Sequence, residues 1–286
     1  MLLNLSPPTP LSYFASLVQS DEHFPLLEAA ASLAQDEEPT LDVQHVLDDV
    51  ERLLRRVQAR LPEDADDLTQ LAILTQVFYK DLGFGVNAND YYAPENSYLN
   101  EVLRTRRGIP ISLAIVWLEL AQALGLQAQG ISFPGHFLVK VSLAGGLVVL
   151  DPLTGKSLGL DNLSERLSPY RSPADRSVAA DLDEGETPLG LYLQACPERD
   201  ILARMLRNLK EIFRSQEDWP RMLQVMDRLV VLLPEYWAER RDRGLVHAEL
   251  GHVHEALQDL RLYLEAVPSG PDTVALRNRV SELSEL

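Results

Sequence analysis

Three residues of the sequence have side chains that could together carry out acyl transfer, namely Ser112, His136 and Asp151. A serine hydroxyl acts as a nucleophile when an imidazole accepts its proton and a carboxylate orients that imidazole. The three residues follow one another along the chain in the order nucleophile, base and orienting carboxylate. This order indicates a candidate catalytic site, provided that the surrounding elements bring the three side chains together.

The element expected to carry Ser112 is a helix over residues 111–124, whose apolar residues recur at helical spacing and which Gly125 would end. Ser112 would lie in its first turn. Backbone N–H groups there have no partner within the helix, and the helix dipole favours negative charge. The start of this helix is therefore suited to a developing negative charge.

His136 and Asp151 flank a predicted β-hairpin. Two strand-like runs, 137–143 and 147–150, are joined through Ala144–Gly146, and a Gly-Gly pair between such runs is a hairpin signal. A connecting loop with an even number of residues would place His136 and Asp151 on one face, a diagonal apart. An odd loop would place them on opposite faces and exclude a shared site.

Each of the three residues also has an ordinary structural explanation. Ser112 could satisfy backbone donors at the start of its helix, and Asp151 before Pro152 is a common turn opener. His136 could be a structural hydrogen-bonding residue after Pro-Gly. Their ordered occurrence in one stretch favours a shared ancestral site over three coincidences.

A long loop without periodicity, residues 83–97, precedes these residues. Long loops in compact domains are uncommon and often functional. This loop could line a pocket, or it could be a Tyr/Pro loop that packs on itself through Asx turns, and the sequence favours neither interpretation. The residues expected to line a pocket beside the candidate site are Asp90, Tyr91, Tyr92, Asn96 and Arg107.

Arg107 belongs to a local basic island with Arg104 and Arg106 in an otherwise acidic chain. These arginines could contact an acidic peptide. Pairing with carboxylates of the chain itself is the favoured interpretation.

The C-terminal part contains an internal repeat, because Leu233-Pro234 and Val267-Pro268 lie 34 residues apart. A period of 34 residues with paired helices is the tetratricopeptide signature. The first copy is degenerate, and a final helix is expected from about Asp272. Small, aromatic and helix-ending residues of the second copy fit the pattern: Trp237, Gly244, His247, Gly251, Ala256, Leu260, Tyr263 and Pro268.

Four long motifs give the chain a resemblance to a known family. They are N-D-Y-Y-A-P-E-N-S-Y-L-N-E-V-L (89–103), R-R-G-I-P-I-S-L (106–113), L-G-L-Q-A-Q-G-I-S-F-P-G-H-F-L-V (124–139) and L-D-P-L-T-G (150–155). With its repeat tail, the sequence resembles the bacterial SirB-one family, in which a transglutaminase-like core precedes tetratricopeptide repeats.

The resemblance implies an α+β fold whose core is of the papain-like cysteine-hydrolase type with a small antiparallel sheet. We expect a helical N-terminal layer packed on the core over residues 1–70, the transglutaminase-like core over 71–196, and α-helical tetratricopeptide repeats over 197–286. In active relatives a cysteine at a helix start pairs with a histidine and an aspartate on strands. His136 and Asp151 match the latter two.

The position of the expected cysteine aligns with, or next to, Ser112. A thiol with a pKa near 8.5 forms a thiolate easily at a helix start, whereas a serine hydroxyl gains far less from the same dipole. The favoured hypothesis is therefore a protein-interaction or regulatory protein, a candidate pseudoenzyme that binds a protein or peptide partner. The alternative is a serine-dependent hydrolase or acyltransferase that acts on a peptide amide through Ser112, His136 and Asp151.

Composition narrows the possible partners. The 286 residues carry a net charge of −17, and 46% of them are hydrophobic, which suffices for a packed core. Residues 1–70 hold net −10, residues 71–198 net −5 and residues 199–286 net −2. A chain this acidic lacks the basic footprint that binding to nucleic acid or an anionic membrane requires.

No cofactor or metal is expected. His247 and His252 stand on either side of the turn at Gly251, and with His254 they form no HExxH motif. The segment 83–85 lacks the glycines of a phosphate-binding fingerprint. The single cysteine, Cys196, excludes an intramolecular disulfide, and the N-terminus lacks a signal-peptide pattern, so we expect a cytoplasmic protein.

Overall fold

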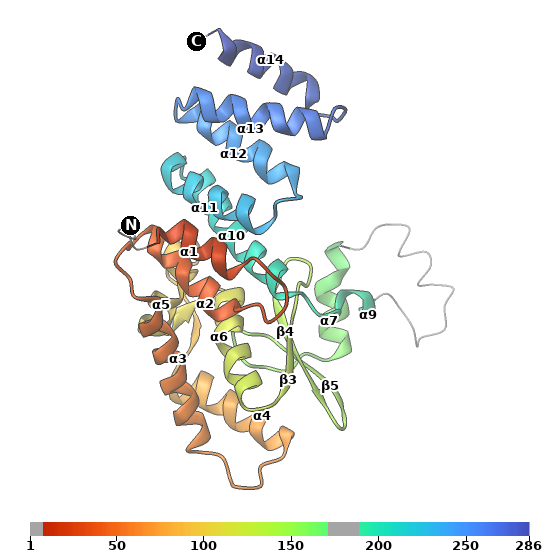
Figure 1. Cartoon of the computed structure of the whole chain (residues 1–286). Helices are drawn as coiled ribbons and strands as arrows, with labels where there is room; N and C mark the ends of the chain where they lie inside the picture. The colour runs from red at the N-terminus through yellow and green to blue at the C-terminus, as the bar shows by residue number, and fades with distance from the viewer. Residues whose placement is uncertain (1–7, 171–188, 286) are drawn as a thin grey trace, which may run out of the picture. The chain divides into compact units, whose positions relative to one another are not determined.

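The structure of the chain is a computed structural model that describes residues 8–170 and 189–285 (Figure 1). It divides into two compact units. The core unit comprises residues 26–31 and 42–201, and the repeat unit comprises residues 1–25, 32–41 and 202–286. The first seven residues, which belong to the N-terminal stretch without a signal-peptide pattern, lie outside the described residues.

This division differs from the three consecutive parts expected from the sequence. Helix α1 (Pro10–Leu17) and the short 3-10 helix η1 (Ser32–Asp36) belong to the repeat unit, where α1 contacts both η1 and α11 (Trp219–Leu232). Helix α2 (Leu26–Ala31) lies between them in sequence but belongs to the core unit. The N-terminal segment is therefore divided between the two units.

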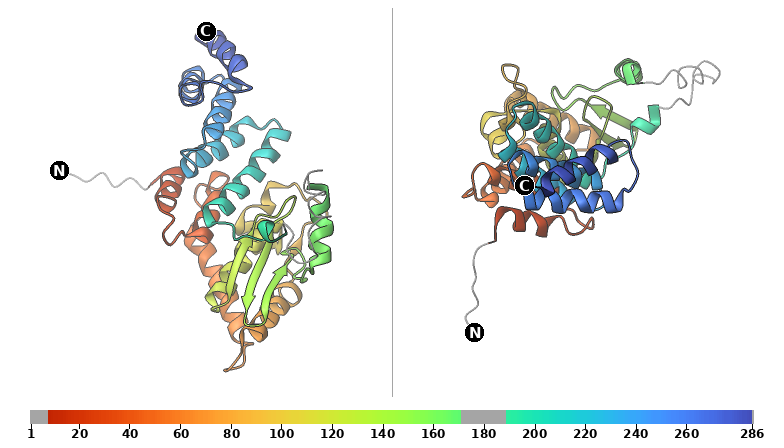
Figure 2. Two further views of the ribbon diagram at one scale, coloured as in Figure 1. Left: turned by 90° about the vertical axis from the view of Figure 1, so that its right-hand side faces the viewer. Right: turned by 90° about the horizontal axis from the view of Figure 1, so that it is seen from above.

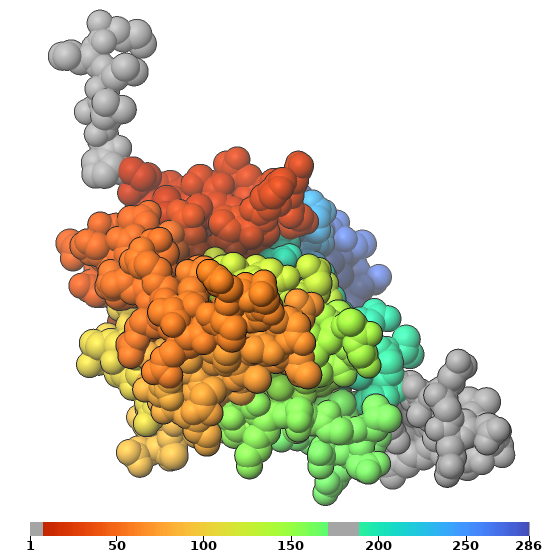
Figure 3. Space-filling model, turned by 90° about the horizontal axis from the view of Figure 1, so that it is seen from below, coloured from red at the N-terminus to blue at the C-terminus, as the bar shows by residue number. Residues whose placement is uncertain are grey.

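Two helices of the core unit begin at an aspartate that caps the first turn. Helix α3 (Val43–Gln58) begins after Asp42, whose carboxylate accepts the backbone N–H of Gln44 at 3.0 Å, and its apolar stripe is buried. Helix α4 (Asp67–Gln76) begins in the same way after Asp66 and continues as a π-helical turn, η2 (Val77–Asp81). Figure 3 shows the orange residues of this region on the face seen from below.

The central element of the core unit is α6 (Pro110–Ala123), whose first nine residues are all buried. A helix that is apolar on every side requires neighbours on every side. Helices α2, α3, α4 and α5 (Leu99–Thr105) and strands β3 and β4 all contact it. This helix therefore holds the candidate site residue Ser112 inside the core.

The larger sheet is antiparallel, in the order β3 (Gln127–Ile131), β4 (Leu138–Leu143) and β5 (Gly146–Leu150). A second apolar cluster joins this sheet to α7 (Leu160–Leu167) and α9 (Leu189–Tyr192). Figure 2 shows α7, in green, beside the three strands. The α+β architecture and the hairpin expected from the sequence are thus confirmed.

A two-residue parallel pair organises the start of α6. Strand β1 (Gly85–Val86) pairs with β2 (Arg107–Gly108). This pairing connects the loop that follows residue 83 to the segment that immediately precedes α6. The loop closes with the 3-10 turn η3 (Pro94–Asn96).

The repeat unit consists of helical hairpins. Helix α10 (Glu198–Ser215) enters it from the core unit and is followed by α11, α12 (Trp237–Glu249), α13 (Val253–Ala266) and α14 (Thr273–Ser284). A Cβ atom at Gly244 would lie 3.0 Å from the Leu260 side chain, so this glycine permits the close approach of α12 and α13.

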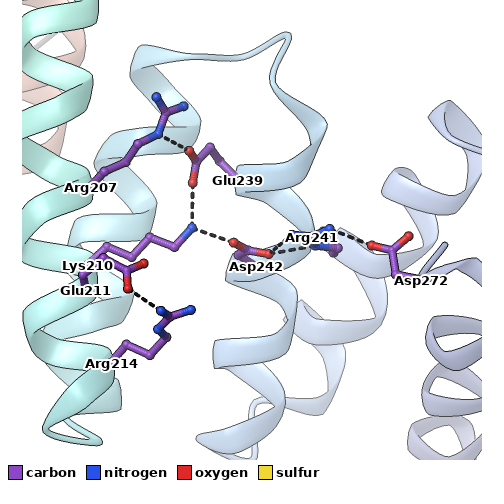
Figure 4. A network of polar contacts seen from close by, with 8 residues as sticks. All are labelled: Arg207, Lys210, Glu211, Arg214, Glu239, Arg241, Asp242 and Asp272. Carbon is purple, nitrogen blue, oxygen red and sulfur yellow. Dashed lines mark hydrogen bonds and ion pairs between the residues drawn. The ribbon is translucent and has the colours of Figure 1, made fainter. Parts of the chain in front are cut away.

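A chain of alternating charges crosses the repeat unit (Figure 4). Lys210 of α10 bonds to Glu239 at 2.9 Å and to Asp242 at 2.6 Å, both on α12. Glu239 also binds Arg207, and Asp242 also binds Arg241. Arg241 in turn binds Asp272, the residue that precedes α14. The chain thereby links α10, α12 and the start of α14. Its members in order are Arg207, Glu239, Lys210, Asp242, Arg241 and Asp272.

Candidate functional site

The hairpin brings His136 and Asp151 together. Leu143 pairs with Gly146 across the turn, so the connecting loop contains two residues, an even number. As expected for an even loop, the two side chains lie on one side, and Nε2 of His136 is 3.2 Å from Oδ1 of Asp151. The imidazole is 18% exposed and the carboxylate 8%. A base and its orienting carboxylate are therefore assembled at a mostly buried position.

Among the described residues, the carboxylate of Asp151 has three polar partners. Besides His136, the backbone N–H of Leu153 donates to Oδ1 at 3.0 Å, and Nη2 of Arg166 on α7 donates to Oδ2 at 3.1 Å. Burial alone would raise the pKa of Asp151, but the His136 and Leu153 hydrogen bonds and the nearby positive charges outweigh it and lower that pKa. The group is therefore a carboxylate acceptor that fixes the His136 ring.

The turn after Asp151 is closed by Gly155 and Tyr79. Gly155 has φ +68°, and a Cβ atom there would lie 2.3 Å from the Tyr79 ring. The Tyr79 hydroxyl donates to the carbonyl oxygen of Pro152 at 3.0 Å. Burial and, secondarily, the negative charge of Asp151 raise the pKa of Tyr79. The tyrosine is thus a neutral donor that holds the D-P-L-T-G turn in place.

Three residues of this site were missed in the sequence, namely Tyr79, Arg166 and Tyr170. Tyr170 belongs to the 3-10 turn η4 (Ser168–Tyr170), directly after α7. A Cβ atom at Gly135 would lie 1.9 Å from its phenol oxygen, which places the hydroxyl against the backbone next to His136. For Arg166 and Tyr170, the signal in the sequence is the amphipathic spacing of α7. This spacing indicates a helix but does not indicate that these side chains make polar contacts at the site.

The hydroxyl of Ser112 is bonded within the core. It is fully buried, donates to the carbonyl oxygen of Asn96 at 2.6 Å and accepts the backbone N–H of Ile109 at 3.1 Å. A serine hydroxyl has one proton to donate. In this structure that proton is directed to a backbone carbonyl, which corresponds to the structural role considered for a serine at a helix start.

Asn96, one of the expected pocket residues, organises its own loop. Its side-chain amide donates to the carbonyl oxygens of Asp90 at 2.7 Å and Tyr91 at 3.1 Å, and its Oδ1 accepts from Asn87 at 3.1 Å. The rings of Tyr91 and Tyr92 meet edge to face at 5.2 Å and are 40% and 73% exposed. The loop therefore presents two phenols on a backbone that a buried amide holds.

The basic island forms bonds within the chain. Arg107 donates to the carbonyl oxygen of Gly83 at 2.6 Å, the guanidinium of Arg106 lies 4.7 Å from the centre of the Phe84 ring, and Arg104 pairs with Glu101. One of the three arginines thus pairs with a carboxylate, as expected, while Arg107 binds backbone carbonyls.

Comparison with known proteins identifies the family. Residues 44–207 match the model of the transglutaminase-like superfamily, and residues 209–281 match a tetratricopeptide repeat model. A UPF0162 protein of Xylella fastidiosa strain Temecula1 is 35% identical over 268 residues, which cover 92% of each chain. The chain belongs to the UPF0162 family of transglutaminase-like proteins.

A named relative agrees with this membership. Protein SirB1 of Salmonella typhimurium is 28% identical to this UPF0162 chain over 242 residues, 84% of this chain and 86% of its relative. The resemblance to the SirB-one family is thus confirmed. Among solved structures, the chain is similar to menin at a TM-score of 0.41 and 11% identity, covering 88% of this chain and 68% of menin.

The described residues include neither a metal-binding cluster nor a membrane-spanning helix. Over residues 8–170 and 189–285, the histidine, cysteine and acidic side chains form no group of three or more that could hold a metal ion. In the same part of the chain, no helix has the length and apolar character needed to cross a membrane. Cys196 is half-buried, and its backbone N–H donates to the carbonyl oxygen of Gly130 at 2.8 Å.

Proposed function

We propose that this UPF0162 protein is a regulatory protein-interaction protein whose transglutaminase-like core holds a peptide or protein partner without acyl transfer. The observation that carries the proposal is the bonding of the Ser112 hydroxyl to Asn96 inside the core. A nucleophile must reach both a substrate carbon and the base that accepts its proton. A fully buried hydroxyl whose proton is directed to a backbone carbonyl does neither.

The remaining groups of the site suit binding. His136 and Arg166 are partly exposed, at 18% and 40% of their side-chain surfaces, and the ionised Asp151 holds both in place. An oriented imidazole and guanidinium can bind the carbonyl or carboxylate groups of a peptide without any bond being broken. Charge-assisted contacts of this kind provide orientation and specificity.

The repeat unit supports the same conclusion independently. Tetratricopeptide arrays are built of stacked helical hairpins and offer extended surfaces that other proteins bind. A protein that combines such an array with a core in which the Ser112 hydroxyl is hydrogen-bonded to Asn96 is suited to binding a protein or peptide partner.

The test uses a fluorophosphonate probe, which labels serines that a base has activated. Wild type and Ser112→Ala are incubated with the probe, and labelled peptides are mapped by mass spectrometry. We expect no label on the peptide that contains Ser112. Labelling of Ser112 in wild type would overturn the proposal. Because the site of labelling is mapped in wild type, this outcome does not depend on whether Ser112→Ala folds.

A serine-dependent hydrolase or acyltransferase for peptide amides is the second candidate. The hydrogen bond between His136 and the ionised Asp151 favours it, because an oriented base is half of the required machinery. The Ser112 hydroxyl would have to leave Asn96 and reach the imidazole. If the protein is such an enzyme, the fluorophosphonate probe should label Ser112 in wild type but not in His136→Ala. The control variant His45→Ala, which changes an exposed histidine, should still be labelled.

A further inference from the structure

Two histidines face each other at the turn between α12 and α13. Nδ1 of His247 and Nδ1 of His252 are 3.3 Å apart, and the ring centroids are separated by 5.6 Å. The sequence suggested that the turn at Gly251 separates these residues. Instead, Gly251 adopts φ +74° and reverses the chain, and the backbone N–H of His252 donates to the carbonyl oxygen of His247 at 2.9 Å. The turn therefore brings the two imidazoles together.

We propose that His247 and His252 form a two-histidine site for a divalent transition metal ion that prefers imidazole, such as Cu²⁺, Ni²⁺ or Zn²⁺. A ring nitrogen lies about 2.0–2.1 Å from a bound zinc ion, and tetrahedral geometry then separates two such nitrogens by about 3.3–3.4 Å. The observed Nδ1 to Nδ1 separation of 3.3 Å matches this value. The two nitrogens are within hydrogen-bonding distance of each other, and an ion would replace that hydrogen bond with little change in their separation.

The backbone limits the freedom of both ligands before any ion arrives. His247 lies in the last turn of α12, and His252 is the residue that caps the start of α13. Neither residue is on a loose loop, since the carbonyl-to-amide bond between them closes the turn. Pre-positioned ligands reduce the entropy that an ion must overcome to bind.

The charges around the pair are compatible with a cation. A cation near His247 is Arg243, four residues earlier in the same helix. Its guanidinium bonds to Asp227 at 2.9 Å and to Asp259 at 2.6 Å, so two carboxylates offset its single positive charge. The surroundings of His247 therefore do not oppose a divalent ion by net positive charge.

The site would be open. Both rings meet at the surface, and in the part of the chain that the structure describes no third histidine, cysteine or acidic side chain completes the group. Water or a donor from another molecule would occupy the remaining positions, as at open sites with fewer protein ligands. Imidazole favours Cu²⁺, Ni²⁺ and Zn²⁺ over Mg²⁺ and Ca²⁺, which prefer oxygen.

Binding would join the end of α12 to the start of α13. An ion that binds the folded hairpin and has little affinity for the unfolded chain stabilises the fold by mass action. Metal should therefore raise the melting temperature of the chain, and EDTA should reverse the increase.

The test is titration calorimetry of the full chain, purified without a histidine tag and freed of metal, with Cu²⁺, Ni²⁺, Zn²⁺ and Mg²⁺. We expect one transition-metal ion per chain and no response to Mg²⁺. Each of His247→Ala and His252→Ala should weaken binding at least about tenfold, because each removes one of two protein ligands. The nearby exposed His254→Ala is the matched control and should bind as wild type does.

Electron paramagnetic resonance of the Cu²⁺ complex gives a second measurement, in which coupling to two imidazole nitrogens is expected. Circular dichroism in EDTA verifies that each variant is folded. Absence of binding by wild type, or full binding by the folded His247→Ala, His252→Ala double variant, would overturn the proposal. Loss of binding in His254→Ala would also contradict it.

Discussion

The guanidinium of Arg228 on α11 forms a two-point ion pair with the carboxylate of Asp36, 192 positions earlier in the chain. The Nε–Oδ2 and Nη2–Oδ1 distances are 2.6 and 2.7 Å, and Nη2 also donates to the carbonyl oxygen of Ser32 at 3.1 Å. The guanidinium lies 4.8 Å from the centre of the Phe14 ring and is 1% exposed. One side chain of the repeats thus binds both N-terminal segments of the repeat unit.

Replacing this arginine should destabilise the repeat unit strongly. In Arg228→Met the carboxylate of Asp36, 17% exposed, loses its counterion, at a cost of about 2–4 kcal/mol in the free energy of unfolding. The free energy of unfolding of Arg228→Lys should lie between those of wild type and Arg228→Met, because an ammonium keeps the positive charge but cannot form the planar two-point bond. Urea unfolding measures both. Arg221→Met on the same helix removes a 41% exposed arginine and should cost less than about 1 kcal/mol, and an equal loss in both would refute this account.

The alternating charges of the repeats lead to a second comparison (Figure 4). Lys210→Met should destabilise the chain by about 2–4 kcal/mol, because Glu239, 7% exposed, and Asp242 lose a shared partner. Arg214→Met, one turn along the same helix, breaks only an exposed pair with Glu211 and should cost less than about 1 kcal/mol. Thermal melts of the two variants give the comparison, and similar melting temperatures would show that the network adds little.

Ser112→Ala should lower stability by about 1–2 kcal/mol, because it removes the buried donor to Asn96 and the acceptor for the Ile109 N–H. The loss stays moderate because the Ile109 N–H also reaches the Asn96 carbonyl oxygen, at 3.3 Å. Chemical unfolding is the measurement, with the exposed Ser142→Ala as control. A Ser112→Ala variant as stable as wild type would mean that these bonds are not structural.

Gly155→Ala should be costly, at about 1–3 kcal/mol, because the position combines φ +68° with a Cβ that would collide with the Tyr79 ring. Gly145→Ala in the exposed hairpin turn, where nothing lies within 4 Å of the new atom, is the control. The double variant Gly155→Ala, Tyr79→Ala should show less than the sum of the single losses. Additive losses would argue against the collision.

The lowered pKa of Asp151 predicts a loss of stability in acid. A carboxyl whose folded pKa lies below its ordinary value of 3.8 stabilises the fold above that value and loses this contribution as pH falls through the folded pKa. Carbon-13 NMR titration should give a midpoint below 3.8, and His136→Ala should raise it. His45→Ala, on the exposed side of α3, should leave the midpoint unchanged. An unchanged midpoint in His136→Ala would be inconsistent with the assigned cause.

The spacing of apolar residues predicted the helix that carries Ser112, and the Gly-Gly pair predicted the hairpin, but neither signal predicted β3. That strand reads Q-A-Q-G-I, and its buried positions include Ala128 and Gly130, which are too small to give an apolar signal. Gly130 is required because a Cβ atom there would lie 2.6 Å from the Phe137 ring. Pairing with β4 creates this strand, and pairing is a tertiary property.

The sequence left open whether His136 and Asp151 meet, because it did not decide whether the hairpin loop is even or odd. The structure has a two-residue loop, and this even loop places both side chains on one face because side chains alternate along strands. Arg166 reaches Asp151 only because α7 packs on the sheet, and no spacing in the sequence reveals that. The bond of Ser112 depends on which way a loop carbonyl at Asn96 points, which residue types do not specify.

Because the N-terminal segment contributes residues to both units, it determines which truncated fragments of the chain can keep a complete repeat unit. A fragment of residues 202–286 would keep Arg228 but lack Asp36, Ser32 and Phe14, and so would retain a desolvated cation without its counterion. A fragment of residues 1–201 would keep those three groups and lose the arginine. The repeat unit is discontinuous in sequence, so a single truncation between the two family matches keeps all residues of the core unit on one fragment but divides the repeat unit between both fragments.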